Sequence, residues 1–430
     1  MGNRLQYRFL IFCFIWFFLM DYVLFDTGLS SIAVYINYLL YVFLALRLIY
    51  FFIFKPNSFL TNGGMLFFRK SSIWLSIFVA YAFFQIILNP DLSSFSYFRQ
   101  NYSVVIPSFS LAILMGLAAF KSRRGGDALF RALYWVMAIV IVYSEISSLA
   151  IGAGQLDDYG FRAEGIFNQA NNYGYFLTLF GIISLFDLTG LIKVNKRKSL
   201  IIFGLVICLI LILRTGSYGS MILITGVGVF LNYQFLKRIS LIKFIGTIVI
   251  LIIVVVTVVS SSKLIGSARI DALWFLLSGG SNEKVLKEST FDFRSALIRK
   301  GFERSLQSPF VGKGIEARNV PIEEKMVTVH NVFIVELLKG GLIGLGIVIM
   351  LYFELWKSIG RIQNKFRLKM ASILFSYIIF IDNTLTYASF LSMNSGVIAL
   401  ALITGLILVD AYESKRSRIV VQRKSLLRSF

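Results

Sequence analysis

The sequence is poor in the residues that build metal centres and disulfides. It contains one histidine, His330, and two cysteines, Cys13 and Cys208. Metal sites draw on His, Cys and clustered carboxylates, so this composition argues against a bound metal ion. The acidic pair Asp157–Asp158 is the remaining alternative for a divalent metal, although a solvated loop turn explains it better. Both cysteines lie inside apolar runs, which excludes a disulfide framework.

Charged residues are scarce as well. They make up 15% of the chain, against 57% hydrophobic residues, and the mean hydropathy is +0.78. A water-soluble domain would not stay in solution with this composition, so we expect an all-α integral membrane protein. The sequence also lacks an internal repeat, a low-complexity tract and a Pro/Gly linker. Residues 1–430 are therefore expected to form a single polytopic membrane domain.

Apolar runs of roughly 20 residues recur along the chain, each long enough to cross the hydrocarbon core as a helix. They are continuously apolar rather than alternating, which favours helices over a barrel. The first run has no small-residue cleavage site, so we expect a retained helix and not a cleaved signal peptide. About twelve spans are predicted, at about residues 8–26, 29–54, 72–89, 102–120, 129–152, 166–190, 199–213, 217–236, 241–260, 330–356, 370–390 and 393–411.

Basic residues outnumber acidic residues by 43 to 22. In a soluble protein this excess would suggest nucleic acid. Here it falls in alternate short connections and in the basic tail 413–430, so no nucleic-acid partner is expected. The positive-inside rule then places both termini in the cytoplasm. The long hydrophilic segment 261–329 is predicted to face the periplasm or the outside.

This outer segment contains the stretch STFDFRSALIRKGFERSLQSP, residues 289–309. Ser and Thr precede an acidic first turn, and Pro309 ends the pattern, which predicts a helix. Its apolar positions indicate an amphipathic helix lying on the membrane surface; they are Phe293, Leu297, Phe302 and Leu306. Its polar face carries four basic residues, which are Arg294, Arg299, Lys300 and Arg304.

His330 stands where this outer segment meets the next apolar run, in VTVHNVFIVELLKGGLIG. Asn331 follows it, and the glycines of GGLIG would let a neighbouring helix approach closely. A histidine at an outer interface has a pKa suited to proton transfer at ambient pH. The alternative is an interfacial histidine that only forms a local hydrogen bond. Glu336, six residues on, projects from another side of a helix and is not expected to pair with it.

A second polar cluster, YGFRAEGIFNQANNYG at residues 159–174, straddles an outer boundary. Arg162 lies in the loop, and Asn168 and Asn171 fall on one side of the following helix. The asparagines could be helix–helix contacts and Arg162 a snorkelling anchor. Together with His330 and the loop arginines, however, they favour an anionic ligand, because guanidinium groups fit phosphate oxygens. A lipid-linked pyrophosphate fits this location.

Three features together resemble the O-antigen ligase and polymerase superfamily of bacterial envelope glycosyltransferases. They are the RxxGxFxxxN run from Arg162 to Asn171, an outer-loop arginine followed by SPFVGKG at 308–314, and HNVFIVELLKGGLIG from His330. The resemblance implies a GT-C-like fold. It also implies transfer of a glycan from an undecaprenyl diphosphate carrier on the outer leaflet, without a nucleotide sugar, metal or other cofactor.

The resemblance implies site residues as well. His330 corresponds to the family histidine, Arg294 to the loop arginine and Arg162 to the arginine before the sixth span, and these three are the expected catalytic residues. Two departures stand out. RTGSYG places Tyr218 where the family often has an arginine, with Arg214 four residues earlier, and Lys339 replaces a common Glu. The expected substrate-binding residues are Asn168, Asn171, Arg214, Tyr218, Arg299 and Asn331.

The motifs do not separate a polymerase, which joins lipid-linked repeat units, from a ligase, which transfers the finished chain to a lipid A core. The 42 Phe and 20 Tyr residues, with the departure at Tyr218, favour a polymerase. A lipid-glycan flippase or other transporter is a further alternative, although it should show gating elements on both sides. Expected partners are the lipid-linked donor, the glycan acceptor, the bilayer and a chain-length regulator protein, at the bacterial inner membrane.

Overall fold

The computed structural model describes residues 62–88, 126–151, 154–157, 160–163, 170–195, 197–215, 217–236, 290–322, 325–384 and 398–411, with a few single positions outside these ranges. The chain divides into two compact units, Met1–Leu129 with Phe293–Phe430, and Phe130–Asp292. We call the first the outer-segment unit, because it contains most of the described outer segment, and we call the second the central unit. Each is described by itself.

The central unit is built around α8 (Ala170–Leu188), which packs against both α9 (Lys198–Thr215) and α10 (Tyr218–Leu236). Aromatic side chains of α8, including Tyr173 and Phe176, are fully buried. Glycines permit the close packing: a Cβ on Gly181 would lie 2.7 Å from Ile224 Cδ1. Before α8 come α7 (Gly126–Ile151) and the antiparallel hairpin of β1 (Gly154–Asp157) and β2 (Gly160–Ala163).

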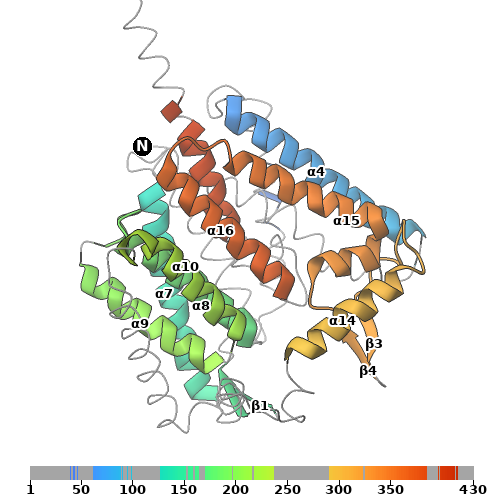
Figure 1. The fold of residues 1–430 in the computed structure, drawn as a ribbon, viewed down its shortest axis with the longest axis horizontal. Coiled ribbons are helices and arrows are strands. Elements are labelled where there is room, and N and C mark those ends of the chain that lie inside the picture. Colours follow the sequence, from blue (N-terminus) through green and yellow to red (C-terminus); the bar gives the residue numbers. More distant parts are fainter. Residues whose placement is uncertain are drawn as a thin grey trace, which may run out of the picture. The chain divides into compact units, whose positions relative to one another are not determined.

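The outer-segment unit contains α4 (Asn62–Leu88), α14 (Thr290–Ser305), α15 (Val332–Ile359), α16 (Lys365–Thr384) and a helical stretch over 398–411. Between α14 and α15 lies a hairpin of β3 (Asn319–Ile322) and β4 (Lys325–Thr328), in which Asn319 faces Thr328. The long helix α15 packs against α4 and α16 (Figure 1).

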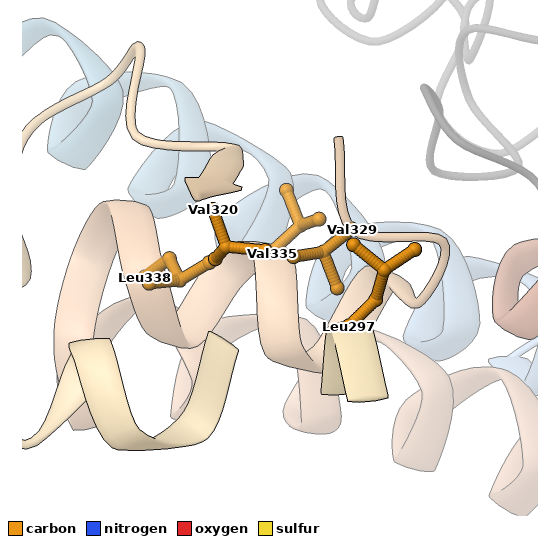
Figure 2. Close-up of a cluster of buried hydrophobic side chains, with 5 residues drawn as sticks. All are labelled: Leu297, Val320, Val329, Val335 and Leu338. Atoms are coloured by element: carbon orange, nitrogen blue, oxygen red, sulfur yellow. The ribbon is translucent and has the colours of Figure 1, made fainter. Parts of the chain in front are cut away.

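Helix α14 is folded onto α15 through a small apolar core. Figure 2 shows the buried side chains, which come from α14, the hairpin region and α15: Leu297, Val320, Val329, Val335 and Leu338. Gly301 brings the two helices close, because a Cβ there would lie 2.5 Å from Ile334 Cγ2. The outer segment is therefore a packed structure on the N-terminal part of α15.

The helix predicted within the outer segment is present as α14, but its apolar face was wrongly assigned. Leu297 is 0% exposed inside the core, whereas Phe302 and Leu306 are 49% and 59% exposed. The cause is helical geometry: Leu297 shares a stripe with Gly301 and Ser305, while Phe302 and Leu306 share the adjacent stripe with Ile298. The prediction merged two stripes that have different surroundings.

The chain is a mostly helical membrane protein. Among the described residues, three helices are long and apolar enough to cross a membrane, at Leu129–Ile146, Lys198–Thr215 and Val332–Ile359. Shorter apolar helices lie at Ile73–Leu88, Gly219–Leu231 and Ile398–Ala411. Four predicted spans lie wholly or almost wholly outside the described residues: 8–26, 102–120, 241–260 and nearly all of 29–54. The total of twelve spans therefore stays a prediction, as do the single domain and the GT-C-like fold.

Candidate active site

The backbone on both sides of His330 is held in place. On one side the Val329 N–H donates to Arg318 O at 2.9 Å, and the Val329 side chain is buried in the core of Figure 2. On the other side Asn331 is the N-cap of α15, and its side-chain oxygen accepts from Ile334 N–H at 3.1 Å. An N-cap of this kind typically contributes about 1 kcal/mol to a helix. His330 therefore has a fixed backbone position at the start of α15.

The Asn331 side chain is itself positioned by α16. Its Nδ2 donates to Asn383 Oδ1 at 2.9 Å, and Asn383 Nδ2 donates to Ile379 O at 2.7 Å. A hydrogen bond within α16 thus orients the Asn383 amide, whose oxygen accepts from the N-cap residue Asn331. Sequence reasoning missed Asn383, whose one signal is a polar side chain near the end of an apolar run.

His330 carries little positive charge in the neutral pH range. Burial, and secondly the nearby Arg294 guanidinium, lower the pKa of His330 from 6.5 to about 4. A neutral imidazole keeps a lone pair that can accept a proton from a hydroxyl group. The structure thus brings Arg294 of α14 close enough to His330 to interact with it electrostatically, and burial together with this cation keeps the imidazole neutral.

The other basic residues of α14 have different surroundings. Arg299 is highly exposed and pairs with Glu303 at 3.0 Å, one turn further along the helix. Arg304 Nη1 donates to Asn319 O at 3.1 Å, and Lys300 Nζ donates to Pro321 O at 3.2 Å, so both attach α14 to β3. Arg299 lies five residues after Arg294, which puts it on another side of the helix. Its predicted contact with substrate stays a prediction.

Helix α15 is broken at Gly341, which has φ 58° and ψ −156°. We call Val332–Gly340 its first piece and Leu342–Ile359 its second piece; Figure 1 shows that they run in different directions. The glycines of GGLIG were predicted to allow a close helix approach, and Gly340 does so: a Cβ there would lie 2.9 Å from Tyr81 Cε1 of α4. The break itself was not predicted.

The SPFVGKG segment fills this break. Lys313 N–H donates to Leu338 O at 2.8 Å and Gly314 N–H donates to Lys339 O at 3.1 Å. In the other direction, Leu342 N–H donates to Pro309 O at 2.8 Å. The backbone groups that the break frees are thus satisfied by the segment, as an apolar environment requires. Two sequence motifs that were read separately form one structural unit.

Helix α4 supports the same junction from the other side. Tyr81 Oη donates to Gly340 O at 2.8 Å, and Gln85 Nε2 donates to Val311 O at 2.7 Å. Sequence reasoning missed both residues, because their partners are more than 200 positions away and no local pattern marks them. The first piece of α15 also buries an ion pair, Glu336 with Lys339, at 3.5 Å.

In the central unit, an arginine, a carboxylate and a phenol meet at one end of the helices. Arg214 Nη1 contacts Glu145 Oε2 at 2.6 Å, and Tyr173 Oη donates to Glu145 Oε1 at 2.8 Å. Arg214 Nε is buried and makes no hydrogen bond among the described atoms. The Arg214 guanidinium is therefore partly neutralised by Glu145, a pairing that sequence reasoning did not propose.

Three of the remaining predicted site residues have a described backbone position in the central unit. Arg162 lies on β2, opposite Gln155, and β2 packs against α8 and α9. Asn171 is in the first turn of α8 and is partly exposed. Tyr218 begins α10, close in sequence to Arg214 at the end of α9; the Arg162 and Tyr218 side chains, and Asn168 entirely, lie outside what the structure describes.

Residues 203–349 match the family model described as O-antigen ligase. Over this stretch, which we call the matched domain, the chain is similar to that family. This domain begins inside α9 and extends into the second piece of α15, so it includes Arg214, Arg294 and His330. The match confirms the resemblance to the O-antigen ligase and polymerase superfamily, and supports a function of that type without distinguishing the two. No curated protein matches the chain.

The described charged groups near the start of α15 suit an anion better than a cation. Within the described part of the chain, no group of three or more His, Cys, Asp or Glu side chains could hold a metal ion. The groups that face the start of α15 are the neutral His330, the cationic Arg294 and the amide of Asn331. This set can accept one proton and stabilise one negative charge, which is the requirement for glycosyl transfer from a phosphate leaving group.

Proposed function

We propose that the protein is a polysaccharide polymerase, which joins undecaprenyl-diphosphate-linked repeat units of an O-antigen or capsule on the outer face of the bacterial inner membrane. The observation that carries the proposal is the neutral His330 beside the Arg294 cation, inside the matched domain. Both termini would be cytoplasmic and the start of α15 would face the periplasm, as the distribution of basic residues predicts.

The proposed reaction is an inverting displacement. The hydroxyl oxygen of the acceptor sugar bonds to the anomeric carbon of the donor while the bond from that carbon to the diphosphate oxygen breaks. The hydroxyl proton goes to His330, and the negative charge that develops on the lipid diphosphate is stabilised by Arg294. The products are a glycan longer by the transferred unit and undecaprenyl diphosphate.

Donor binding would prepare His330 for this role. The pKa of His330 is lowered by burial and by the Arg294 guanidinium. A bound diphosphate would compensate the Arg294 charge and favour the protonated imidazole, so the pKa would rise towards its ordinary value. His330 would then be a stronger base when the anionic donor is in place, which links proton removal to donor binding.

Arginines can take the place of a metal in this reaction because diphosphate is already a good leaving group. Removal of one well-placed donor typically reduces the rate about 100- to 1,000-fold. We assign Arg162 to the same charge-stabilising role, and Asn168, Asn171, Tyr218 and Asn331 to contacts with the donor or acceptor. Arg214 could contribute through its remaining N–H groups, because Glu145 occupies only Nη1 in the described contacts.

A ligase that transfers the finished glycan to a lipid A core is the second candidate, because the match to the family does not distinguish the two activities. Purified protein supplied only with lipid-linked repeat units separates the two. A polymerase makes a ladder of longer lipid-linked chains without any added lipid A core, and it should still do so when EDTA is present. A ligase forms product only after the core is added, and a flippase forms none in either case.

A further inference from the structure

Helix α14 presents three stripes with different surroundings. The first, Leu297, Gly301 and Ser305, is buried against α15 and the hairpin. The second is apolar and exposed, and consists of Ile298, Phe302 and Leu306. The third is polar and exposed, and contains Arg299, Lys300 and Glu303. Three stripes of this kind describe a helix that contacts protein on one side, an apolar phase on the next and water on the third.

A further exposed apolar side chain lies in the turns that follow the end of α14. Phe310 follows Leu306 by four residues and is 68% exposed. Its carbonyl accepts from Ile343 N–H at 3.3 Å, so Phe310 is attached to the start of the second piece of α15. Leu342 and Ile343 are themselves exposed apolar side chains. The chain that follows α14 is therefore attached, at an exposed apolar residue, to the exposed apolar side chains of the second piece of α15.

The break in α15 indicates where the hydrocarbon core begins. The whole of α15 has 28 residues, which exceeds what a core of about 30 Å needs. The second piece, from Leu342 to Ile359, would extend roughly 27 Å at 1.5 Å per residue and so matches the core by itself. The first piece contains the Glu336–Lys339 pair, which is buried in protein and so is not exposed to lipid. Gly341, and with it Phe310, thus marks the boundary.

We infer that the stripe Ile298, Phe302 and Leu306, together with Phe310, is a membrane-docking surface that lies in the outer leaflet of the bilayer. The occupant is phospholipid: acyl chains contact the apolar side chains, and anionic headgroups contact the neighbouring cation Arg299. His330, at the beginning of the first piece of α15, is then held in the headgroup layer. This inference goes beyond the proposed reaction and does not depend on it.

The test uses the full-length protein in vesicles of zwitterionic and anionic phospholipids. Cys13 is replaced by Ser and the buried Cys208 is kept. Single nitroxide labels are then attached to Phe302→Cys and Leu306→Cys, with Ile298→Cys as a further position should either variant fold poorly. Glu303→Cys on the polar stripe is the matched control. Collisions of each label with oxygen, which concentrates in lipid, and with a water-soluble nickel chelate are measured without substrate.

We expect the ratio of oxygen to nickel collisions to be several-fold higher at residues 302 and 306 than at residue 303. Equal ratios at the three positions would show that the stripe faces water, and would overturn the inference. Exclusion of both reagents from 302 and 306 would also overturn it, because it would show that a protein, such as a second copy of the chain, covers the stripe. Since no turnover is measured, either result leaves the proposed polymerase activity to be judged separately.

Discussion

Replacement of Gly312 by Ala should break the junction between the SPFVGKG segment and α15. Gly312 has φ 72°, in the region that favours glycine, and a Cβ there would lie 2.2 Å from Lys339 O and 2.4 Å from Lys339 C. These are backbone atoms, which cannot rotate away as a flexible side chain can. The segment or the helix must therefore move.

The magnitude follows from the contacts that would be lost. The left-handed conformation costs a non-glycine residue about 1–2 kcal/mol. Four hydrogen bonds join the segment to the break, donated by the N–H groups of Lys313, Gly314, Leu342 and Ile343, at 2.8, 3.1, 2.8 and 3.3 Å. Each contributes about 0.5–1.5 kcal/mol. The expected loss of stability is therefore about 3–8 kcal/mol.

Thermal unfolding of the purified protein in detergent, followed by size-exclusion chromatography of heated samples, measures this effect. The matched control is Gly346→Ala, in the second piece of α15, where a Cβ would meet nothing within 4 Å. That variant should be as stable as the parent protein or slightly more stable, because Ala is the better helix former. Equal melting temperatures for Gly312→Ala and Gly346→Ala would refute the claim that the close contact of Gly312 with α15 stabilises the protein.

Three further predictions concern charge. When kcat/KM is measured on lipid-linked repeat units, its fall at low pH should have a midpoint near pH 4 rather than 6.5. The reason is that the pKa of His330 is lowered in the folded protein, so the imidazole stays neutral as pH falls through 6.5. Arg294→Gln should move this midpoint to higher pH. Arg294→Lys should severely reduce the rate of glycan extension, because a lysine cannot form the two parallel hydrogen bonds by which a guanidinium binds phosphate oxygens. The control Arg361→Lys, at an exposed position, should leave the rate unchanged. Equal activities of the two variants would remove Arg294 from the site. Lys339→Met should strongly lower the melting temperature, because the buried Glu336 carboxylate then has no partner, at a cost of about 3–5 kcal/mol. Adding Glu336→Gln should restore much of the lost stability. An unchanged melting temperature for the single variant would show that the pair is unimportant for stability.

The helices that could be predicted from the sequence are those with long continuous apolar runs. The expected spans 199–213 and 217–236 correspond to α9 (Lys198–Thr215) and α10 (Tyr218–Leu236). The existence of α14 also followed from local signals, because its capping residues and its stop lie within the helix or beside it. In each case the information is contained in one short stretch of chain.

Features that depend on distant partners could not be predicted. Two adjacent apolar stripes of α14 look alike in sequence, and only the hairpin and α15 decide that Leu297 is buried and Phe302 is not. The Gly340–Gly341 pair suggested a close contact, but the left-handed conformation of Gly341 exists because Pro309 and Phe310 supply the hydrogen bonds of the broken helix. Likewise Glu145 meets Arg214 across 69 residues of sequence.

The central claim is that His330 removes the proton of the acceptor hydroxyl. The most direct measurement compares His330→Ala with the parent protein, both purified and reconstituted in lipid, in the rate at which a lipid-linked repeat unit is extended. The account predicts a fall of at least about 100-fold with an unchanged melting temperature, because the backbone around His330 is held by Val329 and by the Asn331 cap. Extension at the parent rate by a correctly folded His330→Ala protein would contradict it.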